Sequence, residues 1–167
     1  METDVEGIMQ KTRSTRLRTG IVGCGKVAAT HALAYQALPN SEFVAVCDVA
    51  DIPEKRAVTT CLSGERVAVF RYDGKVSAIS NVCQHQNGPL GEGRIVNGCV
   101  VCPWHGYEYR PDTGASPPPF TEKVPTFDVR IVDGRVFVHP KPHAPGTRVE
   151  PAIVNEGSLE SSAEVRA

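Results

Sequence analysis

Two short segments of the chain combine a cysteine and a histidine at close spacing. Cys83 and His85 are separated by one residue, Cys102 and His105 by two, and sixteen residues lie between the pairs. Thiolate and imidazole are side chains that bind iron and zinc in proteins. A single cysteine or histidine is more often a core residue, but four at this spacing predict a metal centre.

The order of the four residues bears on which metal they bind. Zinc sites with two cysteines and two histidines normally take both cysteines from one element and both histidines from the next. Here each segment supplies one of each, which suits a two-iron core because each segment can then give one ligand to each iron. Structural zinc remains the alternative, since its ligand chemistry is similar. A cysteine–histidine nucleophile is less well supported, because no orienting Asn or Asp is apparent from the motif.

The elements that must position these segments are short strands. Three hairpins are expected, over residues 67–80, 94–101 and 129–138, each with an Asp-Gly or Asn-Gly turn between β-branched runs. Such repetition predicts a mainly β fold, an antiparallel sandwich or barrel. Residues 83–93 and 102–120 interrupt the strand pattern with Gly and Pro. Loops of this kind on a rigid sheet are where function tends to lie.

The composition excludes several classes of function. The net charge of −1 and the pI near 6.5 argue against a nucleic-acid partner. No apolar run approaches the roughly 20 residues that span a bilayer, and the first residues lack a secretion signal, so we expect a soluble cytoplasmic protein with no membrane partner. The remaining cysteines are expected to be small apolar residues without disulfides: Cys24, Cys47, Cys61 and Cys99.

The two metal-binding segments resemble the Rieske [2Fe–2S] family. The C-x-H and C-x-x-H spacing carries the likeness, which extends over about residues 43–140. Further matching positions are Gly88-Pro89-Leu90, Gly106-Tyr107, Thr113-Gly114 and Pro117-Pro118-Pro119-Phe120.

The resemblance implies a Rieske-type antiparallel sandwich or barrel with a cluster-binding subdomain. One [2Fe–2S] cluster per chain would be held with Cys83 and Cys102 on the inner iron and His85 and His105 on the outer iron. We expect one-electron transfer as a ferredoxin-type component of an oxygenase or reductase system, between a reductase and a terminal acceptor. We assign no catalytic residue. The alternatives are a subunit of a nitrite-reductase-like enzyme and a zinc-stabilised binding module.

Some loop residues differ from those of respiratory Rieske proteins, and these differences bear on the reduction potential. Those proteins have a disulfide between the loops and a serine after the second His-Gly, where this chain has Gly88, Trp104 and Tyr107. Fewer hydrogen bonds to the cluster sulfurs stabilise the reduced state less. We therefore expect a potential at the low end of the Rieske range, and Trp104 as an apolar shield.

The N-terminal segment has a different pattern. Residues 20–48 resemble the start of the nucleotide-binding domain of the glucose-fructose oxidoreductase family, with a glycine turn at Gly23 and Gly25 and an acidic residue at Asp48. One strand cannot easily pair in two sheets, so we expect Phe43 to Val49 in the β-domain and no dinucleotide binding. Residues 1–42 are expected to be an extension and residues 141–167 a loose tail.

Overall fold

The computed structural model describes residues 44–155, which fold as short strands and two single-turn 3₁₀ helices. The predicted mainly β class is confirmed. The elements are β1 (Val44–Asp48), η1 (Val49–Asp51), β2 (Arg56–Leu62), β3 (Glu65–Tyr72), β4 (Lys75–Ser80), η2 (Leu90–Glu92), β5 (Arg94–Val96), β6 (Cys99–Val101), β7 (Glu108–Tyr109), β8 (Thr126–Phe127), β9 (Val129–Val132), β10 (Arg135–Val138) and β11 (Ala152–Ile153).

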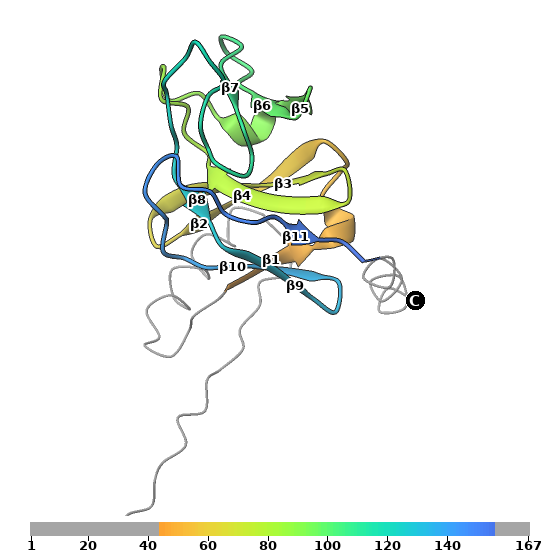
Figure 1. Ribbon diagram of the computed structural model, residues 1–167. Coiled ribbons are helices and arrows are strands. Elements are labelled where there is room, and N and C mark those ends of the chain that lie inside the picture. Colours follow the sequence, from red (N-terminus) through yellow and green to blue (C-terminus); the bar gives the residue numbers. More distant parts are fainter. Residues whose placement is uncertain (1–43, 156–167) are drawn as a thin grey trace, which may run out of the picture.

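The strands form three antiparallel sheets stacked along the molecule (Figure 1). One sheet has the order β1-β10-β9, and a larger one has the order β11-β4-β3-β2 with β8 also paired to β4. The small sheet β5-β6-β7 lies beyond the larger one, at the end opposite β9 and β10. The larger sheet is therefore the middle layer, and the small sheet with its loops forms a separate end of the molecule.

The three predicted hairpins are confirmed as β3–β4, β5–β6 and β9–β10. Their turns are Asp73-Gly74, Asn97-Gly98 and Asp133-Gly134. In each turn both residues have positive φ, between +46° and +78°. This backbone matches the right-handed twist of the paired strands, and Asn, Asp and Gly adopt it at the lowest cost. The turn residues thus determine the register of the strands that carry the site.

The middle sheet is buried on both faces, and β3 shows why. Val67 and Val69 point into the core between the two larger sheets, whereas Ala68 and Phe70 point into a second core under the small sheet. All four are fully buried. Since successive side chains of a strand face opposite sides, a strand covered on both sides is continuously apolar. Packing of Phe70 against the second core fixes the small sheet to the rest of the fold.

The strand at residues 44–48 belongs to the β-domain, as expected: β1 pairs with β10. The proposed glycine turn and helix lie outside the described residues. Within the described part of the chain, no helix is long and apolar enough to cross a membrane.

The expectation of a loose tail from residue 141 is wrong for residues 141–155. β11 pairs with β4, and the backbone N–H of Val154 donates to the carbonyl of Gly74 at 2.8 Å. Ala152 and Val154 pack against the core between the larger sheets. A few apolar side chains and backbone hydrogen bonds hold this segment, and composition and periodicity do not reveal such contacts.

Candidate metal centre

The two Cys-His segments fold into loops with matching backbone hydrogen bonds. The N–H of Cys83 donates to the carbonyl of Gly88 at 2.9 Å, and the carbonyl of Cys83 accepts from Asn87 at 2.8 Å. In the second loop, the N–H of Cys102 donates to the carbonyl of Tyr107 at 2.8 Å, and its carbonyl accepts from Gly106 at 3.0 Å. Two similar loops thus leave the ends of β4 and β6.

The same two loops reverse direction in the same way. Asn87 and Gly106 each lie four residues after the cysteine, and both have positive φ, +60° and +73°. Asn and Gly are the residues that enter this region most readily. The repeated turn places the two cysteines in corresponding positions, with a histidine two residues later in the first loop and three residues later in the second.

The two cysteines lie inside the site. Cys83 and Cys102 are 1% and 2% exposed and belong to the core under the small sheet. Burial raises the pKa of the Cys102 thiol, as does the neighbouring Cys83, while the backbone N–H groups of Trp104 and His105 lower it. Those N–H groups can donate to a sulfur that carries negative charge. The site is therefore built to hold thiolates once a metal ion supplies positive charge.

The two histidines lie at the surface with one ring nitrogen of each close to that of the other. The Nδ1 atoms of His85 and His105 are 3.2 Å apart, with the rings nearly perpendicular at 88°. Two nitrogen ligands about 2.1 Å from one tetrahedral metal ion stand about 3.4 Å apart. The pair therefore fits two imidazoles on a single metal ion, each binding through Nδ1.

The four side chains divide into a sulfur pair and a nitrogen pair. Among residues 44–155, no three His, Cys, Asp or Glu side chains converge on one metal position. A structural zinc ion needs four ligands around a single point. A two-iron core needs two protein ligands on each iron, so the arrangement fits a [2Fe–2S] cluster better than zinc.

Tyr109 is a site residue that the sequence analysis missed. Its hydroxyl lies 3.3 Å from Cys83 Sγ and accepts a hydrogen bond from the N–H of Gln84 at 3.1 Å. The side chain is fully buried, and burial raises its pKa, so the phenol keeps a proton to donate to sulfur. With a [2Fe–2S] cluster bound to Cys83, such a bond would stabilise the more negative, reduced state. It would act against the low potential expected from the absent serine and disulfide.

Gly88 and Trp104 cover the site next to Cys102. A Cβ atom on Gly88 would lie 2.8 Å from Cys102 Sγ and 3.3 Å from the Trp104 ring. Trp104 itself is 55% exposed. The indole therefore lies over Gly88 on one side and faces solvent on the other, which makes it a partial shield.

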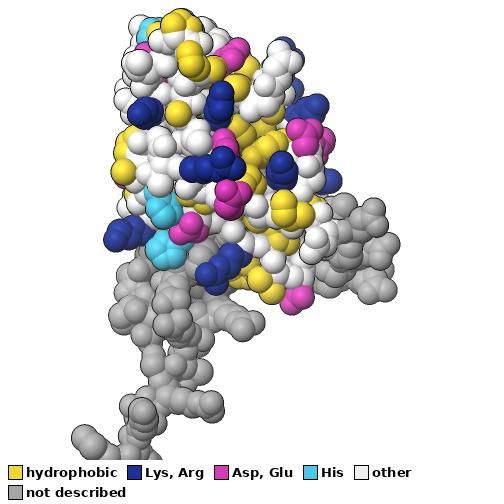
Figure 2. Space-filling model, viewed as in Figure 1, with side chains coloured by type: hydrophobic (Ala, Val, Ile, Leu, Met, Phe, Trp, Pro, Cys, Tyr) yellow, Lys and Arg dark blue, Asp and Glu magenta, His cyan; other side chains and the backbone are white. Residues whose placement is uncertain are grey.

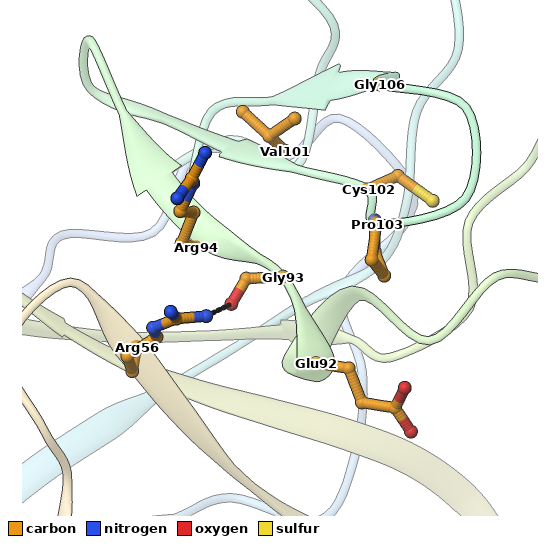
Figure 3. A pocket seen from close by; sticks show the side chains of 8 residues that line it. All are labelled: Arg56, Glu92, Gly93, Arg94, Val101, Cys102, Pro103 and Gly106. Carbon is orange, nitrogen blue, oxygen red and sulfur yellow. Dashed lines mark hydrogen bonds between the residues drawn. The ribbon is translucent and has the colours of Figure 1, made fainter.

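A cleft of about 350 Å³ lies on the opposite side of Cys102 (Figure 3). Arg56 and Arg94 line it, and the Arg56 guanidinium donates to the carbonyl of Gly93 at 3.3 Å. The thiol of Cys102 points away from both arginine side chains. The cleft thus lies behind the site, where Arg56 joins β2 to the loop before β5.

The remaining cysteines in residues 44–155 lie in strands and not in the two Cys-His loops. Cys99 is buried in β6, where burial raises its pKa, and Cys47 packs against the core between the larger sheets. Cys61 is half-buried in β2, and none of the cysteines in residues 44–155 forms a disulfide. Cys24 lies outside the described residues.

Comparison with known proteins places this site in a family. Residues 42–128 match the model of the Rieske [2Fe–2S] domain. The chain is 40% identical over 74 residues to the anthranilate 1,2-dioxygenase ferredoxin subunit of Burkholderia cepacia, a match that covers 44% of this chain and 68% of that one. It is 44% identical over 91 residues to the cholesterol 7-desaturase nvd 1 of Ciona intestinalis, but this match covers 53% of the chain and only 19% of the desaturase.

A solved structure extends the likeness to the fold. The ferredoxin of carbazole 1,9a-dioxygenase from Nocardioides aromaticivorans superposes with a TM-score of 0.57 at 28% identity, covering 60% of this chain and all of that one. Because the family model spans more than half of the sequence, and the ferredoxin is matched over its full length, the assignment covers the fold that holds the site. The chain therefore carries a [2Fe–2S] cluster and transfers electrons through it, and it belongs to the Rieske [2Fe–2S] domain family.

Proposed function

We propose that Cys83, His85, Cys102 and His105 hold the cluster in a ferredoxin-type one-electron carrier. The two cysteines bind one iron and the two histidines bind the other. The observation that carries this proposal is the 3.2 Å approach of the His85 and His105 Nδ1 atoms beside a separate, buried cysteine pair. When bound, the cluster accepts and releases a single electron at a moderate potential, because neutral imidazoles replace two thiolates.

The burial of the four residues supports a direction for electron transfer. Cys83 and Cys102 are covered by protein, whereas His85 and His105 are exposed at the end of the molecule. Electrons therefore enter and leave on the histidine side. Tyr109 holds Cys83 from within, and the N–H groups of Trp104 and His105 face Cys102.

The partners follow from the relatives. Similar chains are ferredoxin subunits of dioxygenases. One is the 3-phenylpropionate/cinnamic acid dioxygenase ferredoxin subunit of Photorhabdus laumondii, which is 32% identical to this chain over 95 residues, and the match covers 90% of that subunit. We infer that this protein passes electrons from a reductase to an oxygenase component in the cytoplasm. A nitrite-reductase-like acceptor is the alternative, and no nucleic acid is involved.

Replacing the four residues tests the assignment. Iron, acid-labile sulfide and zinc would be measured in the wild type and in the Cys83→Ala, His85→Ala, Cys102→Ala and His105→Ala variants, with an electron paramagnetic resonance (EPR) spectrum of the reduced protein. We expect two irons and two sulfides in the wild type and loss of the spectrum in each variant. Cys61→Ala and Cys99→Ala are the controls and keep the cluster. Full iron incorporation in Cys102→Ala, or one zinc per wild-type chain, contradicts the assignment.

A further inference from the structure

Five aromatic rings form a continuous row across the exposed end of the site. Trp104 packs edge-on against His105 at 6.5 Å between ring centroids, and His105 meets His85 at 4.8 Å. His85 stacks on Tyr107 at 4.4 Å, and Tyr107 contacts Phe120 at 5.6 Å. We call these five residues the aromatic row. The two histidines proposed as ligands lie in its interior, with an aromatic residue beyond them on each side.

Both ends of the aromatic row are exposed to solvent. Trp104 is 55% and Phe120 is 54% exposed, so two large apolar side chains flank the histidine pair in open solvent. Burial of large aromatic side chains contributes much of the free energy of binding at protein interfaces, and Trp is among the residues that contribute most. The row is thus an apolar surface centred on the groups through which electrons pass.

The loop segments that carry the aromatic row contain no charged residue, and Glu108 and Glu122 directly follow two of these segments. Residues 83–91, 102–107 and 113–121 contain no Asp, Glu, Lys or Arg. In Figure 2 a histidine and hydrophobic side chains occupy the extreme end of the molecule, acidic side chains lie beside them, and most Lys and Arg side chains on that face lie over the sheets below. A partner that brought charged groups against this end would leave them desolvated and unpaired, at a considerable cost in free energy.

From the row and the uncharged loop segments that carry it, we propose that the aromatic row docks a redox protein through an uncharged, apolar surface on that protein, with Trp104 and Phe120 as the anchors. This rests on the proposed function, because the histidines define where the partner must approach. Recognition then depends on burial of the two rings rather than on ion pairs across the interface. The two rings on either side of the histidines also limit how far the partner can shift along the row.

Two small electron acceptors of equal charge test this without a known partner. Tris(phenanthroline)cobalt(III) has an apolar aromatic shell and hexaammineruthenium(III) a polar one, and both are tripositive, so charge effects cancel in the ratio of their rates. In each reaction the reduced protein loses one electron and the metal complex gains it. Stopped-flow rates would be measured for the reduced holoprotein and its variants.

We expect Trp104→Ser and Phe120→Ser each to lower the cobalt-to-ruthenium rate ratio about threefold to tenfold, because serine offers the aromatic shell far less apolar surface to cover. Val132→Ser and Ile153→Ser are matched controls, since these side chains are 45% and 58% exposed on strands outside the row. Their ratio should equal that of the wild type. The visible spectrum and midpoint potential should be unchanged in Phe120→Ser and in the two controls. Trp104→Ser removes a partial shield of the site, and a shift of its midpoint changes the driving force equally for both acceptors. If Trp104→Ser loses its cluster, Phe120→Ser carries the test.

Three outcomes overturn the proposal. One is an unchanged ratio in the aromatic variants, and another is an equal fall in the two controls. The third is a wild-type dimer in sedimentation that dissociates in Trp104→Ser, which would make a second copy of this chain the occupant. A wild-type protein without iron and sulfide would instead contradict the proposed function, so the two failures are distinguishable.

Discussion

The hydroxyl of Tyr109 lies 3.3 Å from the sulfur of Cys83 and is held there by the N–H of Gln84. The phenol is fully buried in the core under the small sheet. It joins the packed interior to a proposed ligand of the cluster. The tuning of the site therefore depends on a core residue as well as on the two loops.

Removal of this hydroxyl should lower the reduction potential. A donor to sulfur stabilises the reduced state more than the oxidised state, so we expect Tyr109→Phe to lower the midpoint by roughly 30 to 60 mV, the equivalent of about 1 kcal/mol. Protein-film voltammetry measures it. Tyr72→Phe is the control, because the Tyr72 hydroxyl bonds Ser77 at 2.9 Å and not a cysteine. Equal potentials in Tyr109→Phe and the wild type would show that Tyr109 does not tune the cluster.

Gly88→Ala should impair cluster incorporation. The added methyl group would lie 2.8 Å from Cys102 Sγ and 3.3 Å from the Trp104 ring, so the sulfur or the indole must move. Overpacking of this kind costs about 1 to 3 kcal/mol. Iron per chain after expression is the measurement. Gln86→Ala is the control in the same loop, since Gln86 is exposed. Full iron occupancy in Gly88→Ala would show that the loop tolerates the shift.

The segment after residue 141 should contribute to stability. The Thr126 hydroxyl is buried and donates to the carbonyl of Thr147 at 2.8 Å. Valine has nearly the shape of threonine, but it leaves the Thr147 carbonyl without this donor, which lowers the free energy of unfolding by about 1 to 2 kcal/mol. We expect the thermal unfolding midpoint to fall by about 4 to 8 °C. Thr121→Val, at an exposed position, should unfold like the wild type. An unchanged midpoint in Thr126→Val would mean that the segment does not stabilise the fold.

Stability should fall at alkaline pH, partly because of Tyr72. Burial raises the pKa of Tyr72 above 10.0. The unfolded chain then loses this proton at a lower pH than the folded chain, so the contribution to stability is complete below pH 10 and is lost as the pH rises through the folded pKa. The unfolding midpoint, measured from pH 7 to about 11, should fall less in Tyr72→Phe than in the wild type. A fall of equal size in both proteins would assign the loss to other groups.

The hairpins and the paired loops could be predicted because their signals are local. Two-residue Asn-Gly and Asp-Gly turns determine strand pairing, and the distances between Cys and His along the chain are short. β11 and Tyr109 could not be predicted in this way. β11 is only two residues long, and Tyr109 reaches Cys83 across 26 positions of the chain. Contacts of this kind depend on packing between sheets, which periodicity does not encode.

The hydrogen bond from Tyr109 also changes the expected redox behaviour. The absent serine and disulfide still predict a low potential, but the bond from Tyr109 to Cys83 acts in the opposite direction. The positions of the loop residues in the sequence do not reveal this hydrogen bond, because its donor, Tyr109, lies in the core and not in either loop. The midpoint of the wild type therefore measures the balance of the two effects.

Pulsed EPR of the reduced protein, with and without ¹⁵N-labelled histidine, shows whether His85 and His105 bind one iron of the cluster, because a nitrogen bound to the iron couples strongly to the unpaired electron. We predict two directly bound histidine nitrogens in the wild type. A spectrum with no histidine nitrogen, or a reduced protein with no paramagnetic centre and bound zinc, would contradict it.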